Sequence, residues 1–217
     1  MAACTIVGMG PGLGLAIARR FGRAGFAIGM IARKEETLAA AGAALVAESI
    51  ACAGVAADAA SEASLRNALA ELTTSQGDPQ ILVYNAFTDH RVVPTRLSLE
   101  EMIADFRINV GGALVAAQAV APAMIDRGSG AILVTGGGYA LHPAAGRSSL
   151  SLSKAALRNL VMCLAHELEP QGVRVGTVTV FGQIKPNTAF SPEQIAEAFF
   201  AMAQEPPGEP NERQFRG

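Results

Sequence analysis

Residues 7–14 read Val7-Gly8-Met9-Gly10-Pro11-Gly12-Leu13-Gly14 and lie between an apolar run that predicts a strand and a stretch that predicts a helix. Glycines at such a junction let the backbone approach a ligand closely, and the helix N-terminus offers free N–H groups and a positive dipole end. The spacing fits Gly8-x-x-x-Gly12-x-Gly14 and fits G-x-G-x-x-G in no frame. Two interpretations stay open. One is a tight turn without a ligand; the other is a pyrophosphate-binding loop formed by Gly8, Gly10, Gly12, Leu13 and Gly14.

Beyond this loop, short β-rich runs alternate with helical stretches, which is the pattern of βαβ units around a parallel sheet. The six predicted strands are Thr5–Val7, Phe26–Ile31, Ala53–Ala57, Ile81–Tyr84, Ala131–Thr135 and Val173–Val180. The tail at residues 205–217 is rich in Pro, Glu and Gly, and its piece at 212–216 is either a disordered end or, as we favour, a short edge strand. We therefore expect a three-layer, doubly wound, Rossmann-type α/β fold, with residues 1–217 as a single domain.

The composition agrees with this fold class. Half of the 217 residues are hydrophobic but only 5% are aromatic, so the core must be built from aliphatic side chains, as in parallel sheets covered on both faces. The formal net charge of −2 indicates no surface for nucleic acid or for an anionic membrane. The sequence thus predicts a small-molecule-binding protein without nucleic-acid or membrane partners.

Two further features bear on location and metals. The uncharged run from Ile108 to Ile125 has the length of a membrane span, but its polar, glycine and proline content fits a buried helix better. The absence of a basic residue before Arg19 argues against a signal peptide, so we expect a cytoplasmic protein. Cys4, Cys52 and Cys163 have no metal-ligand spacing, which predicts buried reduced thiols and no metal site.

The end of the second predicted strand indicates which dinucleotide would fit. NAD binders carry an acid there that bonds the ribose 2′-hydroxyl. Here the strand ends in Arg33 and Lys34, and the first acid is Glu35. Two adjacent cations suit a 2′-phosphate, because the guanidinium fork matches phosphate oxygens. The pattern favours NADP(H) over NAD(H), although both side chains are also compatible with a solvated helix start.

Several markers along nearly the whole chain resemble the short-chain dehydrogenase/reductase family. In chain order they are Gly8/Gly12/Gly14, Asp58 with Ala59, Asn85 with Ala86, Asn109, Ser153-Lys154-Ala155-Ala156, and Ile184. The resemblance implies that Asp58 and Ala59 meet the adenine, and that Asn85 and Ala86 follow the fourth strand beside the cofactor. It also implies a catalytic Asn109, a ribose-binding Lys154 and a backbone contact from Ile184 to the nicotinamide carboxamide.

The catalytic residues are where the sequence departs from this family. The family's Tyr, four residues before its Lys, is replaced by Leu150, and its Ser, thirteen residues before that Tyr, is replaced by Gly137. Leucine and glycine have no proton to donate, so the usual acid is missing. A serine restored at 137 would meet a further obstacle if Gly137, between two other glycines, adopts angles that only glycine allows.

Other side chains could supply the proton. Tyr139 lies two residues beyond Gly137 on a loop, and we take it as a tentative catalytic residue, with a packing role as the alternative. His142 and His90 could rim the same pocket or be loop surface.

The sequence thus predicts a divergent NADP(H)-binding oxidoreductase of the carbonyl/alcohol class, with a catalytically silent nucleotide-binding or scaffold protein as the alternative. A third possibility, a structural homo-oligomer that has lost the nucleotide, conflicts with the intact glycine spacing. Only nine residues separate Phe181 from Ser191, where the family carries a substrate-covering lid, so the sequence names no substrate. The apolar helices at residues 109–124 and 150–168 predict a homodimer or homotetramer.

Overall fold

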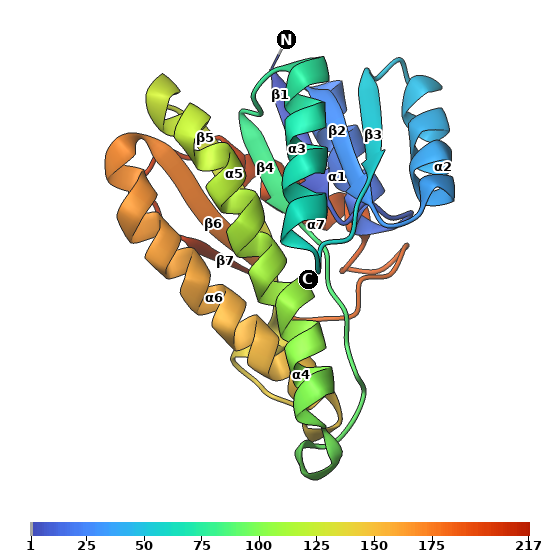
Figure 1. The fold of residues 1–217 in the computed structure, drawn as a ribbon, viewed down its shortest axis with the longest axis vertical. Coiled ribbons are helices and arrows are strands. Elements are labelled where there is room, and N and C mark those ends of the chain that lie inside the picture. The colour runs from blue at the N-terminus through green and yellow to red at the C-terminus, as the bar shows by residue number, and fades with distance from the viewer. Residues whose placement is uncertain (1) are drawn as a thin grey trace.

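One parallel sheet with the strand order β3-β2-β1-β4-β5-β6-β7 forms the centre of the protein, in a computed structural model that describes residues 2–217 (Figure 1). Its strands are β1 (Ala3–Val7), β2 (Ala27–Ala32), β3 (Cys52–Ala56), β4 (Ile81–Tyr84), β5 (Gly130–Gly137), β6 (Val173–Val180) and β7 (Glu212–Phe215). All six predicted strands are present. The favoured edge strand in the tail is β7, which pairs parallel to β6. The doubly wound α/β fold is confirmed.

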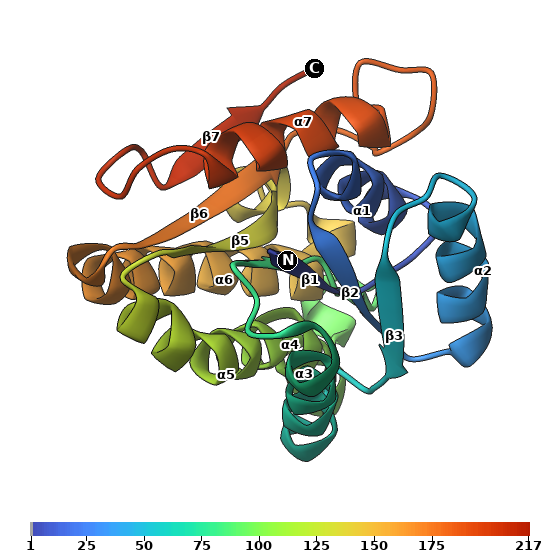
Figure 2. The same ribbon diagram turned by 90° about the horizontal axis from the view of Figure 1, so that it is seen from above.

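Helices cover both faces of the sheet (Figure 2). On one side lie α1 (Leu13–Arg23), α2 (Glu35–Val46) and α7 (Pro192–Ala203), and on the other α3 (Glu62–Gln76), α4 (Leu99–Phe106), α5 (Gly112–Arg127) and α6 (Ser148–Leu168). Successive strand residues point to opposite faces, so each strand supplies two cores. In β5, for example, Leu133 packs into the core under α1 and α7, whereas Val134 packs into the core under α5 and α6. These cores are aliphatic, as the composition predicts.

The helical segment Leu99–Arg127 is, among the described residues, the one helix long and apolar enough to cross a membrane. It consists of α4, a π-helical turn at Arg107–Gly111, and α5. Ala116, Ala117 and Met124 of α5 are completely buried in the core beneath the sheet. This burial agrees with the interpretation of the segment as a core helix.

The cysteines differ from expectation in part. Cys4 is buried in β1 and Cys52 is partly buried, but Cys163 is exposed on α6. The buried stripe of α6 includes Val161 and Leu164, and Cys163 lies beside that stripe rather than within it. The prediction of a buried thiol is therefore wrong for Cys163, because an apolar sequence did not show which face of the helix meets the sheet.

The strand order reverses between β1 and β4. The chain runs from β1 outward to β2 and β3, then returns to place β4 on the other side of β1. In open α/β sheets, such a switch leaves a crevice at the carboxyl ends of the strands, because the connecting segments diverge to opposite sides. Here the segments that follow β1 and β4 are the glycine loop and the segment that begins at Asn85.

Candidate functional site

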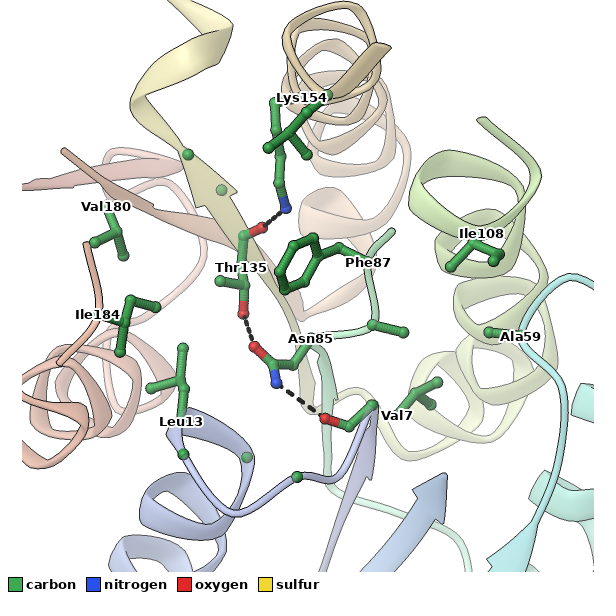
Figure 3. A pocket seen from close by; sticks show the side chains of 18 of the residues that line it. Val7, Leu13, Ala59, Asn85, Phe87, Ile108, Thr135, Lys154, Val180 and Ile184 are labelled. Carbon is green, nitrogen blue, oxygen red and sulfur yellow. Dashed lines mark hydrogen bonds between the residues drawn. The ribbon is translucent and has the colours of Figure 1, made fainter. Parts of the chain in front are cut away.

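A pocket of about 1100 Å³ opens at the carboxyl ends of β1 to β6, over the switch point (Figure 3). Most of the residues singled out in the sequence line it: Gly8, Gly10, Gly12, Leu13, Gly14, Arg33, Asp58, Ala59, Asn85, Ala86, Tyr139, Lys154 and Ile184. Lys34 and Asn109 do not line it. The topology therefore gathers into one cavity residues that are far apart in the sequence.

The glycines of the loop have two different roles. Gly8 has φ +92°, and a Cβ there would lie 2.3 Å from the Ala86 nitrogen, so only glycine lets the loop pack against the end of β4. A Cβ on Gly14 would lie 3.1 Å from the Gly8 carbonyl oxygen. At Gly10 and Gly12, by contrast, a Cβ would meet no atom within 4 Å. These two glycines leave bare backbone facing the pocket, beside the start of α1, which no side chain caps.

A chain of hydrogen bonds crosses the floor of the pocket (Figure 3). The Lys154 Nζ donates to the Thr135 carbonyl oxygen at 2.6 Å, and the Thr135 hydroxyl donates to Asn85 Oδ1 at 2.8 Å. Asn85 Nδ2 then donates to the Gly8 carbonyl oxygen at 3.0 Å. The chain couples α6, β5, β4 and the glycine loop. Sequence reasoning did not single out Thr135 as a site residue, although its place at the end of a strand, just before three glycines, was a usable signal.

Among the described residues, Lys154 is the only lysine that lines the pocket, and it is 8% exposed. Burial lowers the pKa of its ammonium from 10.5 to about 8. The Phe87 ring centroid lies 5.8 Å from Nζ, so the cation also faces an aromatic surface. Leu150, one helical turn before Lys154, lines the same wall and is 6% exposed.

Gly137 has an ordinary backbone. Its φ of −157° and ψ of 143° are extended values open to any residue. A Cβ there would lie 3.6 Å from Lys154 Cγ, an ordinary van der Waals contact. The concern that this glycine needs glycine-only angles is therefore wrong. Its two glycine neighbours do not strain position 137, because Gly137 is the last residue of β5 and keeps the extended conformation of the strand.

Asn109 lies in the π-helical turn and is completely buried. Its Nδ2 donates to the Thr88 carbonyl oxygen at 2.9 Å, and its Oδ1 accepts from the Thr88 N–H at 2.8 Å. Both ends of the amide thus hold the segment that follows β4. The predicted catalytic role of Asn109 remains a prediction, and the geometry gives this side chain a positioning role.

Tyr84 does not line the pocket but contacts the π-helical turn at Arg107–Gly111. Its hydroxyl donates to the Ile108 carbonyl oxygen, and burial raises its pKa above the ordinary value. A Cβ on Gly112 would lie 2.2 Å from the Tyr84 hydroxyl oxygen, so the tyrosine and the glycine fit each other. Tyr84 is the last residue of β4 and immediately precedes Asn85. The structure shows that it closes the π-helical turn against β4.

Charged residues mark the β2–β3 end of the pocket. Arg33 lines it and forms no ion pair with any described residue. Lys34 lies just outside, with Glu35 and Glu36, in an adjacent open groove. Asp58 lines the pocket while its Oδ1 accepts from the Ala60 N–H at 2.9 Å.

The sequence profile of the short chain dehydrogenase family matches residues 2–191. The chain belongs to this family. The resemblance inferred from the motifs is thereby confirmed.

Relatives and structures agree with the assignment. The chain is 29% identical to human (Homo sapiens) 3-oxoacyl-[acyl-carrier-protein] reductase over 81% of its own length and 73% of the relative. It is 32% identical to rabbit (Oryctolagus cuniculus) dehydrogenase/reductase SDR family member 4 over 83% and 68%. A metagenomic short-chain oxidoreductase, solved in complex with NADP, superposes with a TM-score of 0.90 at 25% identity, covering 98% of this chain and 96% of that one.

The remaining candidate donors of this short-chain dehydrogenase differ in their access to the pocket. Tyr139 sits in a 3₁₀ turn at Gly138–Ala140, is 36% exposed and lines the pocket. His142 lines it too, edge-on to Phe181 with ring centroids 5.8 Å apart. His90 does not line the pocket, because its ring nitrogen pairs with the buried Asp105 carboxylate at 2.8 Å. The suggestion that His90 rims the pocket is wrong.

Proposed function

We propose that this short-chain dehydrogenase is an NADP(H)-binding oxidoreductase of the carbonyl/alcohol class that works with a reduced catalytic set. The observation that carries the proposal is the pocket over the switch point, where bare backbone at Gly10 and Gly12 and the buried Lys154 face one cavity. We also propose that it acts on a small molecule in the cytoplasm.

The residues present fit a nicotinamide dinucleotide. The uncapped start of α1 and the open surface at Gly10 and Gly12 suit a pyrophosphate, because N–H groups and the helix dipole both favour anions. Arg33, without an ion-pair partner at the end of β2, suits a 2′-phosphate, which supports NADP(H) over NAD(H). Lys34 would add charge from the adjacent groove. The family resemblance implies that Asp58 and Ala59 meet the adenine and that Ile184 meets the nicotinamide carboxamide, and all three residues line the pocket.

When bound, the nicotinamide would supply or accept a hydride. Lys154, held by the Thr135 carbonyl, would donate its other N–H groups to ligand hydroxyls. Its pKa of about 8 keeps most of the side chain protonated at neutral pH. Leu150 has no proton to offer, and Gly137 has no side chain to polarise a carbonyl. Of the residues that line the pocket, Tyr139 is the proposed replacement acid. Without the usual acid we expect slow turnover, since general acid catalysis is typically worth about 10²–10⁴-fold.

The second candidate is a catalytically silent nucleotide-binding or scaffold protein. The same two positions, Leu150 and Gly137, favour it, because they remove the proton donor and leave the nucleotide end of the pocket untouched. A panel of reactive aldehydes and ketones, followed by NADPH absorbance at high enzyme concentration, separates the two. Turnover that falls when Lys154 or Tyr139 is replaced supports the enzyme. NADPH binding without turnover of any substrate supports the silent protein.

We further propose assembly into a homodimer or homotetramer through the outer faces of α4, α5 and α6. Large apolar side chains are exposed there: Leu99, Ile103, Phe106, Leu114 and Leu152, the first of them 60% exposed. Burying such side chains against a second copy removes apolar surface from water. Light scattering at micromolar concentration tests this proposal, and a monomeric mass would overturn it.

A further inference from the structure

The reaction end of the pocket carries two arginines, Arg91 and Arg147, that the proposed cofactor contacts do not use, beside the cation of Lys154. Arg91, Arg147 and Lys154 all line it. Asp58 is the only carboxylate among the lining residues of the described chain, and it belongs to the opposite, β3 end. The charge is thus concentrated on the segments that follow β4 and β5.

Asp89 orients the two arginines but does not neutralise them. Its Oδ2 accepts from Arg147 Nη1 and lies 3.7 Å from Arg91 Nε. The Asp89 side chain is 6% exposed, whereas those of Arg147 and Arg91 are 30% and 73% exposed. One buried carboxylate beneath two guanidinium groups leaves one positive charge in excess, and Lys154 adds a second on the neighbouring wall.

The segments that carry these arginines are fixed to each other. The Ser148 hydroxyl donates to the Val92 carbonyl oxygen at 2.7 Å, which ties the segment of Arg91 to the first turn of α6. Arg147 immediately precedes α6, and no side chain caps that helix. The positive end of a helix of 21 residues therefore adds to the field of the arginines. Leu150 and Lys154 follow on the same helix, so the charged wall continues into the reaction centre.

We propose that the substrate of this enzyme is an anionic carbonyl or alcohol compound, whose carboxylate or phosphate is bound by Arg91 and Arg147. This rests on the proposed function of the pocket. A guanidinium fork donates two parallel hydrogen bonds to a carboxylate or phosphate, and Arg147 needs little further ordering because Asp89 already holds it. An uncharged substrate would leave this excess charge unmatched in a partly closed cavity.

Matched ligand pairs test the proposal without turnover. Benzoylformate and its methyl ester share the same ketone, and dihydroxyacetone phosphate and dihydroxyacetone form the corresponding phosphate pair. Each is titrated calorimetrically into the full-length protein with and without NADP⁺, which has no hydride to give to a ketone. We expect at least one anion to bind about tenfold more tightly than its neutral partner at low salt. The preferred pair identifies carboxylate or phosphate.

Single substitutions test whether Arg91 and Arg147 cause the preference for the anion. Arg147→Gln and Arg91→Gln should each reduce the preference for the anion about threefold or more, and Arg147→Lys should keep part of it. Arg96→Gln makes the same charge change outside the pocket and should leave the preference intact. The affinity of the neutral partners should be unchanged in every variant.

Three results would overturn the inference. They are equal binding of both members in each pair, no binding of any probe up to millimolar concentration, and a preference that survives the Arg91→Gln/Arg147→Gln double change. If this double variant does not fold, the comparison of charged and neutral ligands on the wild type still decides. Failure of NADP⁺ to bind, with the anion preference intact, would refute the proposed function and leave the anion site standing.

Discussion

At the β1–β2 end of the pocket, Gly10, Gly12 and Arg33 line the cavity, where the two glycines have open space around them and Arg33 forms no ion pair with a described residue. At the β5–β6 end, Leu150 and Gly137 line it where the family resemblance calls for a proton donor and a polarising hydroxyl. The contrast shows that the residues proposed to bind the nucleotide are present, whereas the two residues that would transfer the proton and polarise the carbonyl in the family's reaction are replaced. The hydrogen bonds that run from Lys154 through Thr135 and Asn85 to Gly8 use no side-chain atom of residue 137 or 150, so changes at these two positions leave the chain of bonds intact.

The largest expected effect is a gain of turnover when the two replaced residues at the reaction end are restored. Leu150→Tyr combined with Gly137→Ser should raise NADPH-dependent turnover of a reactive carbonyl by about 10²–10⁴-fold, the usual worth of general acid catalysis. Gly137 has extended angles and room for a Cβ, so the serine should fit. Steady-state assays give the rate. Leu150→Phe with Gly137→Ser is the matched control, with a ring of similar size and no hydroxyl, and an equal gain in the control would disprove proton donation by the new tyrosine.

The next effect is a loss of NADPH affinity when the glycine loop is changed. Gly12→Val should weaken NADPH binding by roughly 100-fold, about 2.7 kcal/mol, because its side chain would occupy the space through which the pyrophosphate approaches. The melting temperature should change little, since a Cβ at Gly12 meets no protein atom within 4 Å. Gly8→Val serves as the contrast and should destabilise the fold itself, because Gly8 has a positive φ and abuts Ala86. Unimpaired NADPH binding by Gly12→Val would remove the glycine loop from the site.

Burial of the charged Lys154 side chain should lower the free energy of unfolding of the wild type. Its pKa falls from 10.5 to about 8 on folding, a shift that corresponds to roughly 3 kcal/mol of penalty for burying the charge. Lys154→Met loses the Thr135 hydrogen bond as well, so we expect a net gain of about 2 kcal/mol at pH 7 in urea unfolding without nucleotide. The folded state releases its proton first as the pH rises, so the wild type should gain stability between about pH 8 and 10.5 and approach the variant. The exposed Lys185→Met is the control, and a constant difference across this range would contradict the burial argument.

The smallest effect concerns the choice between dinucleotides. Arg33→Gln should weaken NADPH binding about tenfold, the low end for losing a charge-assisted hydrogen bond to phosphate, and leave NADH binding unchanged. Lys34→Gln, outside the main pocket, should do less. Competition against a fluorescent nucleotide measures both affinities. Equal losses of affinity for NADPH and NADH would mean that Arg33 does not bind the 2′-phosphate.

The fold was predictable because its signals are local. The apolar runs and the glycine loop predict β1 to β6, and the tail predicts the edge strand β7. The residues of the nucleotide end were predictable for the same reason, since a parallel sheet brings the ends of its strands to one edge. Lys34 is the exception, because one residue beyond Arg33 the chain already begins α2 and leaves the cavity.

The rest of the site depends on pairings between distant segments. Arg147 and Asp89 are 58 residues apart, and Thr135 and Asn85 are 50 apart, so periodicity and spacing could not join them. The hydrogen bond from the Asn109 amide to the Thr88 carbonyl oxygen could not be predicted from the sequence for the same reason. The face of α6 that carries Cys163 was also undetermined, because an apolar helix does not reveal which side meets the sheet.

The most direct measurement of the central claim is a calorimetric titration of NADPH and NADH into the wild type and into the Leu150→Tyr/Gly137→Ser variant. If the two ends of the pocket are separable, both proteins bind NADPH with the same affinity and more tightly than NADH, while only the variant turns over a reactive carbonyl at an ordinary rate. If the wild type binds neither nucleotide, or if its NADPH affinity changes with residues 137 and 150, the separation does not exist.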